Sequence, residues 1–205
     1  LLAARPMRLG LAVGGAALLI ALAWGGLGLG GVERVDWFDA AVLSQRIRQT
    51  ALEQRADQKY ICCNADEGDS GNFADRMLME GDAFALIEGM AIAGRATGAD
   101  TGYIYIRSEY PHAVATMRRA VEIWHAAGLS DFRIEIRMGG GAYICGEESS
   151  MLESLEGKRG QVRAKPPIPA ISGLFGKPTV VNNVLTLAAV GDILAKGAAH
   201  YCNFG

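Results

Sequence analysis

The sequence has few cysteines, and none of them are spaced for metal binding. Its four cysteines are Cys62, Cys63, Cys145 and Cys202. A zinc ribbon or an iron–sulfur cluster needs pairs of thiolates separated by two to four residues, so no metal site is predicted within this chain. Free thiols in a reducing cytosol are the simplest interpretation, which predicts a cytoplasmic protein.

The sequence also lacks an excess of charge of either sign. It carries 20 basic and 22 acidic residues, and the two kinds are interleaved, as in Arg118, Arg119 and Glu122. A nucleic-acid-binding protein gathers lysine and arginine on one face, so this balance argues against a nucleic-acid partner. Because 50% of the residues are hydrophobic, a compact domain with a real core is expected.

Charge is absent altogether from Leu9 to Val32, a stretch long enough to span a bilayer but crowded with glycine. Two interpretations stay open. The stretch is either an anchor or signal segment, which would tether the protein at the inner membrane, or translated sequence foreign to the domain. Residues 37–54 have helix-forming composition and indicate a surface helix or a tether. We therefore predict an atypical segment over residues 1–57 and a domain, truncated at both ends, over residues 58–205.

After Gln58, short apolar runs alternate with helical patterns, as is typical of βαβ units. The patterns predict strands over 60–63, 103–107 and 132–138, and helices over 82–96, 111–127, 145–155 and 183–196. A segment rich in Pro, Gly and Lys, 157–178, is expected to form a long ordered loop. This order predicts an α/β fold, a Rossmann-like three-layer domain with a small parallel sheet and right-handed crossovers.

Two loops that follow predicted strands carry most of the residues suited to chemistry, because ligands of a parallel sheet bind beyond the carboxyl ends of its strands. The first loop, NADEGDSGNFADR over 64–76, sets acidic side chains beside glycines. Such acids accept hydrogen bonds from sugar hydroxyls or flavin N–H groups, and glycine lets the backbone approach a flat ring. A solvated acidic turn or a calcium loop is the alternative, although the spacing does not match an EF-hand.

The second loop, GGGAYICGEES over 139–149, is a glycine-rich turn that leads into an expected helix. A helix N-terminus exposes backbone N–H groups and a partial positive charge, which suit a phosphate or an electron-rich flavin edge. Glu147 and Glu148 also have an ordinary explanation, since a carboxylate stabilises a helix N-terminus by a few tenths of a kcal/mol up to about 1 kcal/mol. From the residues alone, a ligand site and simple capping both stay open.

Several long strings resemble the FMN-binding domain of the flavoprotein subunit shared by NADH:quinone oxidoreductase, NAD-reducing hydrogenases and NAD-dependent formate dehydrogenases. The strings are YICCNADEGDSGNFADR, GYIYIRSEYPHA, GGGAYICGEESSMLESLEGKRGQVRAKPPIPA and GLFGKPTVVNNVLTL. The resemblance covers about residues 59–195. Met151, the stretch KRGQVRAKPP and Leu185 resemble the formate dehydrogenase beta subunit more than the quinone-reductase branch.

The resemblance implies hydride transfer between the nicotinamide C4 of NAD(H) and the flavin N5, followed by electron transfer to iron–sulfur clusters. Glu148 is the expected catalytic-site residue, at the place where the nicotinamide docks. The implied FMN-binding residues, running from the flavin ring through the isoalloxazine edge to the ribityl and phosphate end, are Asn64, Asp66, Glu67, Gly68, Tyr143, Gly146, Glu147, Asn182 and Asn183.

The sequence departs from the family pattern before its first matching string. The family places a loop of the form GRGGAGFPxGxKW there, which wraps the FMN phosphate, whereas this chain has DAAVLSQRIRQTALEQ over 39–54. Losing those backbone donors predicts weak or absent FMN binding by this chain alone. The alternative hypothesis is a membrane-tethered scaffold that has lost its flavin.

The resemblance also implies partners that lie outside this chain. The ligands of the family's iron–sulfur cluster are absent here, so the clusters are expected in missing parts or in other subunits of a multi-subunit dehydrogenase. A formate-oxidising subunit is among the expected partners if the formate dehydrogenase branch is right. Contact with a membrane stays an open prediction.

Overall fold

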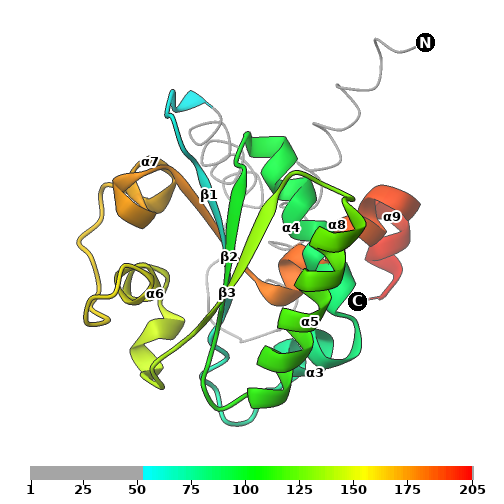
Figure 1. Ribbon diagram of the computed structural model, residues 1–205, viewed down its shortest axis with the longest axis horizontal. Coiled ribbons are helices and arrows are strands. Elements are labelled where there is room, and N and C mark those ends of the chain that lie inside the picture. Colours follow the sequence, from blue (N-terminus) through cyan, green and yellow to red (C-terminus); the bar gives the residue numbers. More distant parts are fainter. Residues whose placement is uncertain (1–52, 205) are drawn as a thin grey trace, which may run out of the picture.

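The computed structural model describes residues 53–204, which form three layers: a central parallel sheet and a layer of helices on each of its faces (Figure 1). The sheet has four strands in the order β3-β2-β1-β4, and every neighbouring pair is parallel. The strands are β1 (Tyr60–Ala65), β2 (Thr101–Ile106), β3 (Arg133–Met138) and β4 (Thr179–Asn183). The predicted α/β fold with a small parallel sheet is confirmed. The predictions for residues 9–32 and 37–52 lie outside the described residues.

Helices cover both faces of the sheet (Figure 1). One face packs against α3 (Ala74–Gly81), α4 (Ala83–Thr97), α5 (Pro111–Ala127) and α8 (Val184–Lys196). The other face packs against the short helix η1 (Tyr143–Gly146), α6 (Glu148–Leu155), α7 (Pro169–Ser172) and η2 (Leu174–Gly176). The short elements α9 (Ala198–Tyr201) and η3 (Cys202–Phe204) follow α8. Within residues 53–204, no helix is both long and apolar enough to cross a membrane.

The central strand β1 is buried on both faces, which explains why it reads as a continuous apolar run. Ile61 and Cys63 belong to the core under α4 and α5, and Cys62 belongs to the smaller core under α6. Met151 and Leu174 complete that smaller core with no exposed surface. The central strand is therefore fixed from both sides of the sheet, whereas the edge strand β3 is exposed at alternate positions.

Helices α4 and α8 lie unusually close to each other, and Gly89 makes this approach possible. A Cβ atom built on Gly89 would lie 1.8 Å from the carbonyl oxygen of Leu187 in α8. Any side chain at position 89 would push the helices apart, so the missing Cβ sets the distance between them. This packing fixes where α8 begins, next to the end of β1.

The strand order creates a switch point between β1 and β4. From β1 the chain moves outward through β2 to β3, then crosses back on the other face and adds β4 to the free side of β1. The connections on the two sides of β1 therefore lie on opposite faces of the sheet. A crevice beyond the carboxyl ends of β1 and β4 is where an α/β sheet of this kind binds ligands.

Four features differ from the elements expected from the sequence. Helix α3 and strand β4 were not predicted, and the predicted helix over 145–155 is interrupted near its start. Residues Tyr143–Gly146 form a 3-10 turn, and the α-helix begins only at Glu148. The expected loop over 157–178 also contains α7 and η2.

Candidate functional site

The loops after β1 and β3, far apart in sequence, meet at the carboxyl edge of the sheet. The side-chain amide of Asn64 donates a hydrogen bond of 2.9 Å to the carbonyl of Gly146. A Cβ built on Gly68 would lie 2.8 Å from the ring of Tyr143, and one built on Gly146 would lie 3.4 Å from the carbonyl of Asp66. The structure thus brings these five predicted residues into one site.

Asp66 is the least satisfied polar residue of this site. Its side chain is buried, and its Oδ2 atom has no hydrogen-bond partner within the described chain. Burial raises the pKa of its carboxyl group, although the Arg107 guanidinium opposes this effect. Buried acceptors in proteins are nearly always paired, so this unpaired atom at the carboxyl edge of the sheet is a candidate to accept a hydrogen bond from a ligand.

The ring of Tyr143 supplies an apolar surface beside this acceptor. Its side chain is 78% exposed, which is unusual for a large aromatic residue held in an ordered turn. It lies against Gly68, where the missing Cβ leaves room for the ring. An exposed aromatic ring beside a buried hydrogen-bond acceptor fits a flat heteroaromatic ligand that has polar edges, as a flavin has. Of the predicted set, Asp66, Gly68 and Tyr143 are the residues that could hold one.

Glu67 has a different task from the one the resemblance implies for its side chain. Its carboxylate accepts hydrogen bonds from the backbone N–H groups of Asp75 at 3.1 Å and Arg76 at 3.3 Å, and from the Tyr110 hydroxyl at 3.1 Å. It therefore caps the second and third residues of α3, whereas the N–H of Ala74 donates to the side-chain oxygen of Asn72 at 3.2 Å. The carbonyl of Glu67 accepts a hydrogen bond from the Arg107 guanidinium. With the side chain committed, mainly the backbone of this residue is left for a ligand.

Glu147 likewise caps a helix. Its Oε2 accepts hydrogen bonds from the backbone N–H groups of Ser149 at 2.9 Å and Ser150 at 3.0 Å, and from the Ser149 hydroxyl. Burial alone would raise the pKa of Glu147, but these bonds and the ammonium of Lys165, 3.1 Å away, lower it to about 2. The capping interpretation left open by the sequence therefore describes this carboxylate.

Glu148 stands at the rim of the site with Lys165. The Nζ of Lys165 donates to Oε1 of Glu148 at 2.5 Å, and both side chains are about one third exposed, at 37%. The hydrogen bond to Glu148 raises the pKa of Lys165, against the opposing effect of desolvation. This pair offers an exposed donor and an exposed acceptor close together, which is suitable for the hydroxyls of a sugar.

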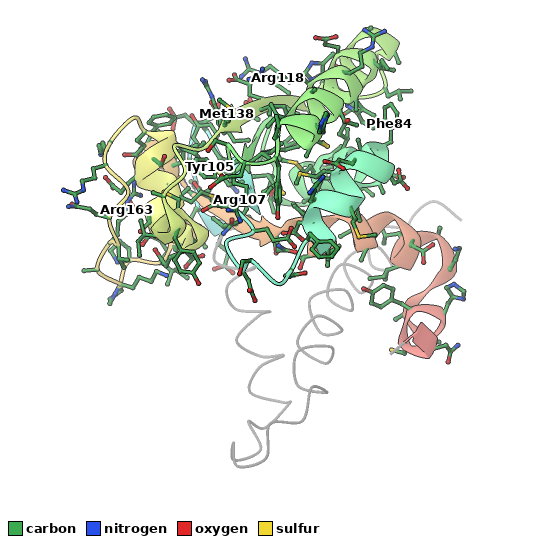
Figure 2. The ribbon with its side chains drawn as sticks, turned by 90° about the horizontal axis from the view of Figure 1, so that it is seen from below. Phe84, Tyr105, Arg107, Arg118, Met138 and Arg163 are labelled. Carbon is green, nitrogen blue, oxygen red and sulfur yellow. The ribbon has the colours of Figure 1, made fainter. Side chains whose placement is uncertain are left out.

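Arg163 holds the loop that carries Lys165. Its guanidinium contacts Glu153 at 2.5 Å, Glu156 at 2.8 Å and the carbonyl of Gly173 at 2.8 Å. Arg163 lies on the α6 side of the molecule, opposite the helical layer that contains Phe84 (Figure 2). One planar guanidinium thus makes hydrogen bonds to three different residues, which orders the loop, so Lys165 is presented from a fixed backbone.

The two asparagines at the end of β4 complete the switch point. Asn182 pairs in register with Cys63, and Asn183 pairs with Asn64. The side-chain Oδ1 of Asn183 accepts a hydrogen bond from the N–H of Leu185 at 2.9 Å and so caps α8. Its amide donates to Oδ2 of Asp75 at 2.6 Å. Asn183 is thus largely occupied inside the protein, whereas Asn182 makes no side-chain hydrogen bond within the described chain.

Reasoning from the sequence did not assign a role to Arg107, Lys165 or Asp75. Arg107 follows directly after β2, so the rule that directed attention to the loops after strands could have found it. Lys165 had no such signal, because its partners lie 17 or 18 residues away along the chain. Asp75 stood among the acidic residues of the loop after β1, but its bond to Asn183, 108 residues away, could not be read from the sequence.

A parallel α/β sheet with a polar and aromatic site at its switch point defines the class of nucleotide- and flavin-binding domains. Comparison with known proteins makes the assignment narrower. The chain belongs to the family described as the Nuo51 FMN-binding domain, whose model matches residues 45–192. The predicted family membership is thereby confirmed.

Curated relatives agree with the family assignment. The chain is 51% identical over 156 residues to an NADH-quinone oxidoreductase subunit of Rhizobium meliloti, a match that covers 72% of this chain and 37% of the relative. It is 46% identical over 164 residues to the NADP-reducing hydrogenase subunit HndC of Solidesulfovibrio fructosivorans, with 76% and 33% covered. The chain thus spans little more than a third of the length of these relatives.

A solved structure supports the same fold. The H2-reduced NAD+-reducing [NiFe]-hydrogenase has a chain that superposes with a TM-score of 0.71 at 42% identity. The match covers 76% of this chain and 28% of the hydrogenase chain. At this identity the likeness extends to the sequence of the domain as well as its topology.

Proposed function

We propose that this domain binds FMN in the crevice between the loops after β1 and β3 and serves an NAD(H)-linked oxidoreductase. The observation that carries the proposal is the unpaired, buried Oδ2 of Asp66 beside the exposed ring of Tyr143. Membership of an FMN-binding family supports it, as do the oxidoreductase names of the relatives. When bound, FMN supplies the chemistry that accepts a hydride at the flavin N5.

The chain's own residues have binding and orienting tasks in this proposal. Asp66 accepts a hydrogen bond from an N–H or O–H group of the flavin, and Tyr143 gives the ring an apolar neighbour. Glu148 and Lys165 lie at the rim, where they bind the hydroxyls of the nicotinamide dinucleotide and set its ring against the flavin. Glu67 and Glu147 fix the two loops by capping helices, so they shape the site from behind.

Glu148 is placed where the nicotinamide docks, and its task is orientation. Hydride transfer moves no proton to a side chain, so no acid or base is required there. The Lys165 ammonium holds the Glu148 carboxylate in one place, 2.5 Å away. Removing Lys165 leaves the Glu148 carboxylate without this partner, whereas removing Glu148 leaves Lys165 bonded to Glu147 at 3.1 Å, so loss of Lys165 should loosen the docking of the dinucleotide more.

The finer assignment concerns the assembly to which the domain belongs. We propose a multi-subunit dehydrogenase in which iron–sulfur clusters of other parts or subunits receive the electrons. The formate dehydrogenase branch rests on Met151, the KRGQVRAKPP stretch and Leu185. The relatives named above are quinone-reductase and hydrogenase subunits. The formate branch therefore stays a prediction, to be tested by purifying the native assembly and assaying it with formate.

Titration of the purified chain with FMN, followed by flavin fluorescence, tests the proposed site. We expect weak, saturable binding with one site, because the family's phosphate-wrapping loop has no counterpart in the sequence. Asp66→Ala should weaken binding by about 10- to 100-fold, the effect of losing a charge-assisted hydrogen bond of roughly 1.5–3 kcal/mol.

Asp69→Ala is the matched control, since Asp69 lies three residues further along the same loop and its side chain accepts only from the backbone of Gly71. Equal affinities for the two variants would contradict the assignment of Asp66. Binding of NAD but not FMN by the wild-type chain would contradict the flavin site as a whole.

A further inference from the structure

Asp75 is a buried carboxyl group that the proposed flavin chemistry does not use. It lies in the first turn of α3 and is only 4% exposed. Its Oδ2 accepts a hydrogen bond of 2.6 Å from the amide of Asn183 at the start of α8. Its backbone N–H donates to the carboxylate of Glu67, 3.1 Å away. Asp75 therefore joins the loop after β1 to the end of β4, across the switch point.

The groups around Asp75 offer it no counter-charge. Glu67 faces it from the loop after β1, Cys63 from β1 itself and Asn183 from the start of α8. The Tyr110 hydroxyl of α5 is bonded to Glu67.

The two arginines that lie over the Tyr110 ring are paired with other carboxylates. Arg76 is paired with Glu80 at 3.1 Å, and Arg107 with Glu109 at 3.2 Å. Within the described residues, no ion pair includes Asp75. Its negative charge depends on one amide hydrogen bond.

Three physical effects set the protonation of this group. Desolvation by burial raises the pKa of Asp75 to about 6, and the charge of Glu67 adds to the effect, while the bond from Asn183 opposes it. Anything that removes water from this corner, brings a negative charge near it or draws away the Asn183 amide favours the neutral carboxyl group. An anionic ligand filling the adjacent crevice does at least one of these.

We propose that Asp75 is a positioning residue that takes up one proton from solvent when the flavin site fills, and so links ligand binding at the switch point to pH. The proton goes to a carboxylate oxygen of Asp75, and no bond in the ligand is made or broken. Neutral Asp75 no longer opposes the charge of Glu67, and the Asn183 amide becomes free to turn toward the ligand. This inference rests on the proposed function of the domain.

The test measures the FMN dissociation constant of the full chain from pH 5.5 to 8 for the wild type, Asp75→Asn and Asp69→Asn. If one proton is taken up, the wild-type dissociation constant rises by up to about tenfold per pH unit above the pKa of Asp75. Asp75→Asn, which keeps the shape but is always neutral, should bind with little pH dependence. Asp69→Asn, an exposed change in the same region, should follow the wild-type profile. Parallel profiles for all three proteins would overturn the proposal.

A second measurement does not depend on FMN. Carboxyl carbon NMR of the ligand-free chain, titrated from pH 3 to 8, should show one aspartate that titrates near pH 6 and disappears in Asp75→Asn. If every aspartate titrates at or below about pH 4, the inference is wrong. If Asp75 titrates near 6 but none of the three proteins binds FMN, the proposed flavin site fails, and the linkage to FMN fails with it.

Discussion

The closeness of α4 and α8 gives a sharp prediction for Gly89→Ala. The added Cβ would meet the Leu187 carbonyl oxygen at 1.8 Å, whereas real Cβ contacts essentially never fall below 3.0 Å. The helices must therefore part by about 1.2 Å or bend, because the obstacle is backbone and cannot rotate away. Overpacking of a core costs about 1–3 kcal/mol when side chains can adjust, and occasionally more. The higher helix propensity of alanine offsets at most about 1 kcal/mol of this cost.

We expect Gly89→Ala to lower the free energy of unfolding by about 2–4 kcal/mol. The assay is urea unfolding followed by far-UV circular dichroism. Two other glycines form a graded control series. Gly81→Ala in α3 meets no atom within 4 Å and should be neutral or stabilising by up to about 1 kcal/mol. Gly191→Ala in α8 meets only the flexible carboxylate of Glu88 at 3.1 Å and should change stability little. A Gly89→Ala protein as stable as Gly81→Ala would refute the reasoning.

The capping and loop-holding residues give two further predictions. The pKa of Glu147 is lowered in the folded state to about 2. Its contribution to the free energy of unfolding is therefore complete above pH 4.5 and is lost as the pH falls toward 2. Glu147→Gln should therefore cost about 1–2 kcal/mol at pH 7, with the difference from the wild type shrinking by pH 2.5 in urea unfolding. Arg163→Ala should cost about 1–3 kcal/mol and speed tryptic cleavage between 157 and 165. Unchanged cleavage would show that Arg163 does not order that loop.

The long apolar and amphipathic elements could be predicted from the sequence because their patterns are local. The helices α4, α5 and α8 and the strands β1, β2 and β3 all fall close to their expected bounds. Strand β1 is a continuous apolar run, whereas the other elements have apolar residues at the period of their own secondary structure. Helix α5 also carries Pro111 at its first turn and Gly128 in a left-handed conformation at its end.

The elements that were missed depend on distant partners. Helix α3 begins after Phe73, which offers no side-chain cap, and the N–H groups of Asp75 and Arg76 in its first turn are satisfied by Glu67 from the preceding loop. Strand β4 has only five residues and directly follows a proline. It is a strand because it pairs with β1, which lies 119 positions earlier at the pair Tyr60↔Thr179. Neither arrangement produces a periodic pattern of apolar residues in the local sequence.

The meeting of the two loops could be predicted from the sequence, but the tasks of the individual residues could not. The expected convergence of the two loops is present, through Asn64, Gly68 and Tyr143. The roles of Glu67 and Glu147 could not be separated from the sequence, because a helix-capping carboxylate and a ligand-binding carboxylate look the same in a motif. Burial and hydrogen-bond partners distinguish them, and these are properties of the folded chain.

The bond between Asp75 and Asn183 has a consequence for how the protein is made. It joins residues 108 positions apart, and the bond from Asn64 to Gly146 spans 82. Until β4 has emerged from the ribosome, the nascent chain lacks Asn182 and Asn183, so the site at the end of β1 is incomplete. A cofactor that binds the complete site would therefore stabilise only the fully folded domain, and it would not direct the early steps of folding.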